Sequence, residues 1–283
     1  MESSKMVHTE GVTITLSTVA SEALKALFWG VFFQSKNRGV TLQRHFPWLS
    51  AASKGVIFAE ARIGTVTIGG LVLREKQYQL GERTLRIAMI GLVCVAQGER
   101  GKGIANSMLE VIIAHAREQQ FDYLTLWTSQ YSVYEKHGFQ VADRWMYGWV
   151  RGAEDDDRKD QPPFEPDSKL VPDNSLPLPP FARAVYCYSD PVCSMVVLED
   201  AHGAIVTAYD GLPAAAASAM VRHLPSCWRL NVLAQDAILQ ALQRHGKTLE
   251  LAPVRLQMWL PLRDFLPVEQ LLDHVTFPVL DRI

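Results

Sequence analysis

A short basic loop that contains two glycines is the part of this sequence best suited to chemistry. It runs from Arg100 through Gly101, Lys102 and Gly103 to Ile104, and the pattern that follows predicts a helix. Glycine lets a backbone turn tightly or approach a ligand, and a helix start presents free N–H groups and the positive end of its dipole. An anionic phosphate is the natural occupant of such a loop.

Two nucleotide-binding motifs do not fit this loop. A P-loop ends in Gly-Lys followed by Ser or Thr, but Lys102 is followed by Gly103. The stretch 246–248 has the right ending, but Ala241 stands where the first glycine of the motif belongs. A dinucleotide fingerprint needs a third glycine where this chain has Asn106. A nucleotide or dinucleotide enzyme is therefore disfavoured.

A second pattern lies downstream, where Tyr134, Gly138 and Phe139 form a Tyr-x-x-x-Gly-Phe sequence. Together with Arg-x-x-Gly-x-Ala at 100–105, this pattern resembles the paired motifs of the GNAT superfamily of N-acetyltransferases. The two motifs agree with the family in order, spacing and context, and the resemblance covers about residues 12–150. It implies an α/β (α+β) fold with a mixed, mostly antiparallel central sheet flanked by helices.

The resemblance implies that the ligand is acetyl-CoA, used as a co-substrate. Backbone groups of Val93, Cys94 and Val95 would then contact the pantetheine arm. Backbone N–H groups of the loop and the first helical turn would hold the pyrophosphate, from Arg100, Gly101, Lys102, Gly103, Ile104, Ala105 and Asn106. The Arg100 and Lys102 side chains are equally compatible with solvated loop cations.

Tyr134 is the residue that the resemblance assigns as general acid. In direct transfer, an amine attacks the thioester, and the departing CoA thiolate takes a proton that a phenol of pKa about 10 can deliver. The alternative is that Tyr134 is a packed aromatic residue on a short helix. A backbone N–H near Val95 would stabilise the oxyanion, as the family implies.

The general base is not apparent from the sequence. The central strand at 85–95 carries no carboxylate, unlike that of many family members. Glu60 and Glu82 are expected in turns, and His137 is expected at a helix end or on the surface. A base that acts through a water molecule, or an amine that is already neutral when it binds, fits the sequence equally well. The missing base also leaves open a second function, a non-catalytic sensor or interaction module that only binds acyl-CoA.

Alternating strands and helices must position these residues. Hydrophobic periodicity predicts strands at 12–16, 55–60, 65–74, 85–95, 123–127 and 139–150, and helices at 21–33, about 103–119 and 131–136. The stretch 151–180 contains an acidic run and seven of the 15 prolines of the chain, which predicts an extended, solvated linker. A catalytic domain at 1–150 would precede it.

Residues 181–283 weakly echo the first half and predict a degenerate GNAT-like domain in tandem. The strand at 123–127, the His137-Gly138 pair and Met146 are followed by counterparts at 229–233, 245–246 and 258. Leu242 stands where the first half has Tyr134, and the loop at 210–213 has no Arg or Lys. We therefore expect a structural role for this half, without a cofactor loop.

Composition limits the remaining function classes. The 283 residues include 28 Lys+Arg and 30 Asp+Glu, so the formal net charge is -2, and we expect no nucleic-acid partner. No membrane span or signal peptide is apparent, which predicts a cytoplasmic protein without a membrane partner. Cys94, Cys187, Cys193 and Cys227 lack metal-site spacing, so we expect no metal.

The acceptor is expected to be a small-molecule amine, and a homodimer is left open. An apolar or cyclic acceptor could lie against the aromatic residues of the closing strands, although such residues are more often core: Trp127, Trp145, Tyr147 and Trp149.

Overall fold

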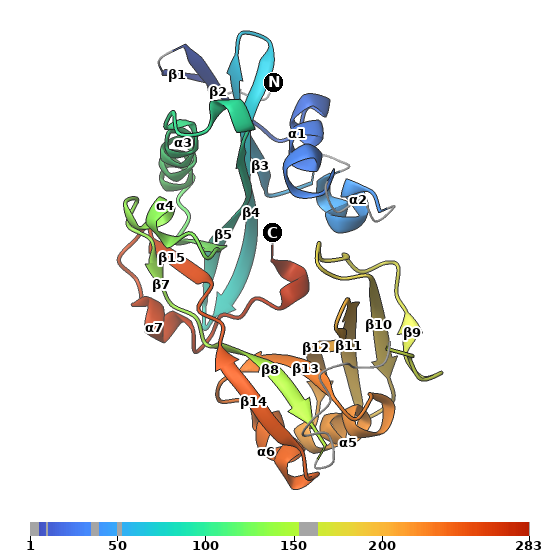
Figure 1. Ribbon diagram of the computed structural model, residues 1–283. Coiled ribbons are helices and arrows are strands. Elements are labelled where there is room, and N and C mark those ends of the chain that lie inside the picture. Colours follow the sequence, from blue (N-terminus) through green and yellow to red (C-terminus); the bar gives the residue numbers. More distant parts are fainter. Residues whose placement is uncertain (1–5, 10, 35–39, 50–52, 153–163, 283) are drawn as a thin grey trace. The chain divides into compact units, whose positions relative to one another are not determined.

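The chain folds into two compact units, each discontinuous in sequence (Figure 1). The computed structural model describes residues 6–9, 11–34, 40–49, 53–152 and 164–282. The first unit comprises residues 1–142, 256–276 and 282–283, and the second comprises 143–255 and 277–281. Each unit is built on one sheet.

The first sheet has eight strands in the order β1-β2-β3-β4-β5-β6-β15-β7 among the described residues. Neighbouring strands are antiparallel, except that β5 and β6 are parallel. The strands are β1 (Met6–Thr9), β2 (Val12–Ser17), β3 (Val56–Ile63), β4 (Val66–Leu80), β5 (Arg83–Val95), β6 (Tyr123–Trp127), β7 (Gln140–Val141) and β15 (Gln257–Pro261). The helices are α1 (Glu22–Phe32), α2 (Leu42–His45), α3 (Ile104–Glu118), α4 (Tyr131–Glu135) and α7 (Val268–Leu271), with short 3-10 turns η2 (Pro47–Leu49) and η3 (Gln97–Glu99).

Two adjacent glycines of β4 bring a helix close to each face of this sheet. A Cβ on Gly69 would lie 3.1 Å from Met108 of α3, and a Cβ on Gly70 would lie 2.2 Å from Leu24 of α1. Successive strand residues point to opposite faces, so α3 and α1 cover opposite sides of β4 (Figure 1). One apolar core lies under each helix.

The second sheet has seven strands in the order β14-β8-β13-β12-β11-β10-β9 within the described ranges. Its strands are β8 (Trp145–Arg151), β9 (Val171–Pro172), β10 (Ala184–Ser189), β11 (Cys193–Asp200), β12 (Gly203–Gly211), β13 (Trp228–Leu233) and β14 (Thr248–Pro253). Helices α5 (Pro213–His223) and α6 (Ala237–Arg244) pack on it, and η4 (Val279–Asp281) contacts β12. The parallel pair β12–β13 repeats the parallel pair β5–β6 of the first sheet.

The two halves of the chain exchange a strand. In the first sheet, β15 lies beside β6 with Met258 opposite Leu126. In the second, β8 lies beside β13 with Met146 opposite Val232. Leu126 is the fourth residue of β6 and Val232 is the fifth residue of β13, so each half supplies the other with an antiparallel strand at a corresponding place in the sheet. The compact units therefore do not coincide with the contiguous halves expected at 1–150 and 181–283.

Two local predictions were wrong. The single strand expected at 139–150 is two strands, β7 and β8, which belong to different sheets. The described part of the expected linker, 164–180, is not simply extended and solvated, because Phe164, Leu170 and Leu178 are buried and β9 pairs with β10. Proline is tolerated there because β9 is an edge strand. The acidic run at 154–157 lies outside the described residues.

Candidate functional site

The strands β5 and β6 part halfway along β5. Their parallel ladder pairs Ile87 with Tyr123, Ala88 with Leu124, and Met89 with Thr125, and it ends there. A bulge follows in β5, where Leu92 adopts a left-handed φ of 51°. Such a conformation costs a non-glycine residue about 1–2 kcal/mol, so packing must enforce it. The second half of β5 thus presents an edge that β6 does not cover.

The backbone N–H and C=O groups of successive β5 residues point to alternate sides of the strand, and this determines which of them face the open edge. The Ala96 N–H donates to the Ile68 carbonyl of β4 at 2.8 Å, and Cys94 lies opposite Gly70 of the same strand. Because backbone groups of successive residues in a strand point to alternate sides, those of Val93 and Val95 face the opening. Of the three strand residues expected to contact a cofactor arm, these two have backbone groups directed toward the opening.

Cys94 is buried beneath α1, with a side chain only 5% exposed. Burial raises the pKa of its thiol to about 12. Since only a thiolate is strongly nucleophilic, Cys94 does not suit a covalent acyl intermediate.

The glycine loop joins the open edge to α3. Gly101 and Gly103 both have φ of 78°, a left-handed conformation that favours glycine. Gly103 is the N-cap of α3 and provides no side-chain cap. The first intrahelical bond is donated by the Ser107 N–H to the Gly103 carbonyl at 3.1 Å, so the N–H groups of residues 104–106 precede the intrahelical ladder. These are the donors an anion would use.

Both loop cations make contacts within the loop region. The Arg100 Nε donates to the Val95 carbonyl at 3.1 Å, and the Lys102 Nζ lies 2.8 Å from a Glu99 carboxylate oxygen. The Lys102 side chain is more than half exposed, so this ion pair is weak. The backbone of the loop therefore offers the better-defined anion donors.

Tyr134 lies on α4, which follows β6. It is 8% exposed and packs edge-on against Phe139, with ring centroids 6.0 Å apart. Within the described residues its hydroxyl makes no hydrogen bond. Burial raises the pKa of the phenol above its ordinary value, so it stays protonated at neutral pH. Tyr134 is therefore a packed aromatic residue whose phenol keeps its proton, so its packing does not exclude the general-acid role expected from the sequence.

The three candidate general bases from the sequence, Glu82, Glu60 and His137, lie in different environments. Glu82 is exposed in the β4–β5 turn, as expected. The prediction that Glu60 lies in a turn was wrong: it is a buried residue of β3. Its Oε1 accepts hydrogen bonds from Ser21 at 3.0 Å, Arg62 at 2.9 Å and Thr67 at 2.5 Å. Because Ser21 also caps α1, Glu60 anchors that helix.

His137 follows α4 and is half-buried. Partial burial lowers the pKa of its imidazole, and its Nε2 is buried without a hydrogen-bond partner in the described chain. It is the remaining candidate for a neutral base.

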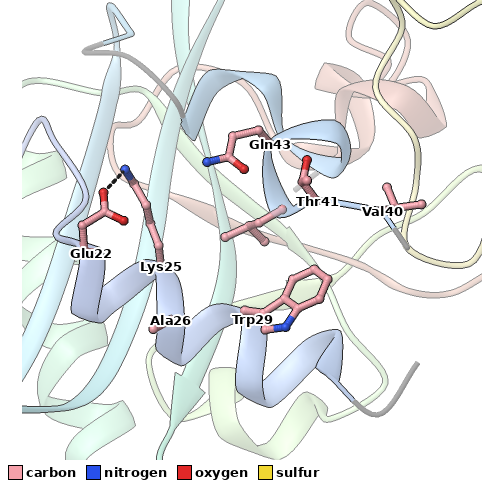
Figure 2. Close-up of a pocket in the computed structure, with 8 residues that line it drawn as sticks. Glu22, Lys25, Ala26, Trp29, Val40, Thr41 and Gln43 are labelled. Atoms are coloured by element: carbon pink, nitrogen blue, oxygen red, sulfur yellow. Dashed lines mark hydrogen bonds and ion pairs between the residues drawn. The ribbon is translucent and has the colours of Figure 1, made fainter. Parts of the chain in front are cut away.

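A groove of about 470 Å³ lies between α1 and the start of α2, and its lining residues come from these two segments (Figure 2). Glu22 and Lys25 form an ion pair of 2.8 Å at one side, and Trp29 supplies an apolar wall. Val40, Thr41 and Gln43 face them from the α2 side. The groove combines apolar and polar walls and is large enough for a small molecule. Sequence reasoning missed it, because no local pattern says that these two segments meet.

The aromatic residues expected to line one acceptor site are divided between two sheets. Trp127 ends β6 of the first sheet, whereas Trp145, Tyr147 and Trp149 lie on β8 of the second. The idea that they form one set from the closing strands of the first half was wrong, because β8 pairs with β13 and β14.

The corresponding position of the second unit differs from the first. The loop after β12 leads to Leu212 as N-cap and Pro213 at the first turn of α5, where proline has no N–H to donate. The Tyr209 hydroxyl donates to Asp236, which caps α6 beyond β13. Leu242 is fully buried where the first unit has Tyr134. These features favour packing over anion binding.

The part of the chain that the structure describes contains no group of three or more His, Cys, Asp or Glu side chains arranged for a metal ion. Among the same residues, no helix has the length and apolar character that a membrane crossing requires.

Comparison with known families gives a match over residues 21–142, which fit the model of the acetyltransferase (GNAT) domain. This part of the chain is a GNAT acetyltransferase domain. The match contains the opening of β5, the glycine loop and Tyr134, and it agrees with the resemblance seen in the sequence. A comparison with curated proteins gives no match.

Solved structures show that the GNAT fold extends over both units. The GCN5-related N-acetyltransferase from Kribbella flavida has a TM-score of 0.59 at 12% identity and covers 88% of this chain and 72% of its own. The GCN5-related N-acetyltransferase from Anabaena variabilis ATCC 29413 has a TM-score of 0.60 at 14% identity, covering 88% and 73%. Eis1 from Mycobacterium abscessus has a TM-score of 0.55 at 14% identity, covering 93% and 76%. At such identities the likeness concerns the fold, and the expected tandem α/β architecture is confirmed.

Proposed function

We propose that the first unit transfers the acetyl group of acetyl-CoA directly to the amine of a small-molecule acceptor. The observation that carries this proposal is the opening of β5 beyond the Met89–Thr125 pair, next to a glycine loop at the start of α3. The loop suits the pyrophosphate, and the backbone groups of Val93 and Val95 suit the amides of the pantetheine arm. Such a ligand would extend from the loop into the opening.

The chemistry follows from this arrangement. The amine nitrogen attacks the thioester carbonyl carbon, forming the C–N bond, and an N–H of the open edge near Val95 stabilises the oxyanion. Collapse of the intermediate breaks the C–S bond, and the thiolate takes the proton of the Tyr134 hydroxyl. The proton lost by the nitrogen returns to the phenolate through water, so one proton passes from nitrogen to sulfur overall. The high pKa of Cys94 supports direct transfer over a cysteine-bound intermediate.

The acceptor enters from the side of α1. Because the loop and α3 lie on one face of the sheet and α1 on the other, a donor anchored at the loop presents its acyl group toward α1. The groove between α1 and α2 lies on that side and takes the body of the acceptor, with Trp29 as its apolar wall. The second unit acts as a scaffold. We assign the reaction to the cytoplasm, because the four cysteines are free, as expected in a reducing compartment.

The test combines binding and turnover. Thermal unfolding is measured with CoA, acetyl-CoA, NAD and ATP, and thiol release is then followed with a library of amines. We expect CoA and acetyl-CoA to raise the melting temperature and at least one amine to release thiol. Stabilisation by NAD or ATP but not by acetyl-CoA would overturn the proposal. Trp29→Ala should raise the KM for the amine and leave the CoA affinity unchanged.

A non-catalytic acyl-CoA sensor is the second candidate. It is favoured by the engagement of Glu60, whose Oε1 already accepts three hydrogen bonds and so makes a poor base. Binding of acetyl-CoA without thiol release from any amine would support the sensor.

A further inference from the structure

Thr125 lies at the point where β5 and β6 separate, and its hydroxyl is hydrogen-bonded to β15, the strand on the other side of β6. The residue is fully buried. Its Oγ1 donates to the Met258 carbonyl of β15 at 3.0 Å and accepts from the Gln257 Nε2 at 3.0 Å. Gln257 is itself 2% exposed, so the network is shielded from water and costly to break.

Beyond Thr125, β6 is paired on one side only. Leu126 lies opposite Met258 and Trp127 opposite Gln257, while no β5 residue of the described ladder faces either of them. The course of β6 away from β5 is therefore fixed by β15. Since the opening is the gap between β5 and β6, β15 determines its width.

We infer that Gln257 is a positioning residue for the cofactor site, acting through Thr125 to fix the opening that receives the pantetheine arm. This inference rests on the proposed function of the first unit. Gln257 is buried and bonds to Thr125, so it would act through Thr125 rather than on the ligand directly, and it lies outside the matched residues 21–142. Gln257 lies on β15, which follows β14 of the second sheet along the chain but lies beside β6 in the first sheet. Residues of the second half of the chain therefore help to form the binding site of the first unit.

The chain offers a matched control on the same strand. The Tyr123 hydroxyl donates to the Leu266 carbonyl at 2.8 Å and accepts from the Leu266 N–H at 3.0 Å. Tyr123 is also fully buried, but it lies opposite Ile87, where the β5–β6 ladder is intact. Tyr123→Phe thus removes two part-buried hydrogen bonds between β6 and the C-terminal segment, away from the opening.

The experiment compares Gln257→Leu, Thr125→Val and Thr125→Ser with Tyr123→Phe in the full chain. The Kd for CoA is measured by calorimetry, and the melting temperature is measured for each variant. We expect Gln257→Leu and Thr125→Val to raise the Kd about tenfold. Thr125→Ser keeps the hydroxyl and should bind CoA like the wild type. Tyr123→Phe should lower the melting temperature without changing the Kd. If Gln257→Leu does not fold, Thr125→Val tests the same hydrogen bond from its other end.

In the turnover assay, the KM for acetyl-CoA should rise in Gln257→Leu while the KM for the amine stays constant. Equal CoA affinity in the wild type, Gln257→Leu and Thr125→Val would overturn the inference, and so would an equal loss of affinity in Tyr123→Phe. A wild-type chain that does not bind CoA would instead refute the proposed function, so the two failures can be told apart.

Discussion

The Nε of Arg100 donates a hydrogen bond of 3.1 Å to the backbone carbonyl of Val95. The bond ties the start of the glycine loop to the last residue of β5, which borders the open strand edge. With Arg100 engaged in this way and Lys102 paired with Glu99, a bound pyrophosphate would depend mainly on backbone N–H groups and the dipole of α3.

Glu99→Gln should tighten CoA binding. The substitution removes the carboxylate that pairs with Lys102 and leaves the ammonium for the phosphate. Exposed ion pairs contribute up to about 1 kcal/mol, so we expect the Kd to fall by up to about fivefold at low salt. The gain should vanish in high salt, because the interaction is screened. Glu82→Gln, in the exposed β4–β5 turn, is the charge-matched control, and an equal effect there would argue against a local role for Glu99.

Gly70→Ala should destabilise the first unit, whereas Gly30→Ala should stabilise it. A Cβ on Gly70 would lie 2.2 Å from Leu24, so α1 must shift at a cost of about 1–3 kcal/mol. Among the described residues, a Cβ on Gly30, inside α1, would meet only the Gln34 side chain at 3.6 Å, and alanine is favoured over glycine in a helix by about 1 kcal/mol. Chemical denaturation of both variants checks the opposite signs.

Cys94→Ala should retain turnover. The thiol is buried under α1 with a pKa of about 12, so it remains protonated at any working pH and forms no acyl intermediate. We expect a kcat within twofold of the wild type and a loss of stability of about 1 kcal/mol from the lost packing. Mass spectrometry after incubation with acetyl-CoA should show no acetylated Cys94. A hundredfold loss of kcat would require a covalent route.

Local sequence patterns predicted the elements of the first unit but not their neighbours. Alternation at 139–150 identified extended chain, yet it could not say that β7 joins the first sheet and β8 the second, because strand partners are chosen by non-local packing. The same limit hid Gln257, which reaches Thr125 across 132 residues of sequence. Glu60 was expected in a turn because a carboxylate is rarely buried unless several donors surround it. Its donors are Ser21, the N-cap of α1, together with Arg62 of β3 and Thr67 of β4, and the sequence alone does not show that they meet.

The pH dependence of turnover should reflect the raised pKa of Tyr134. A general acid works while protonated and is lost as the pH rises through its pKa. Because burial raises that pKa above 10, the wild-type rate should show no alkaline fall up to about pH 10. The rate should instead rise with pH as the acceptor amine loses its proton. Tyr134→Phe should lower kcat about 10²-fold or more and leave the CoA Kd unchanged. A fall of the wild-type rate between pH 8 and 9 would contradict this assignment.

A chain that ends at residue 180 should fail to fold, although it contains the glycine loop, Tyr134 and all matched residues. It lacks β15, whose Met258 and Trp259 are fully buried in the first unit. The outer edge of β6 would then be unpaired, and the core beside it would be incomplete. Joining residue 142 to residue 256 through a short linker should restore folding, because the Ala142 N–H donates to the Gln257 carbonyl at 3.1 Å and the two ends already meet. We expect the joined chain to unfold cooperatively and to bind CoA. Cooperative unfolding of the chain 1–180 would show instead that the exchanged strand is dispensable to the first unit.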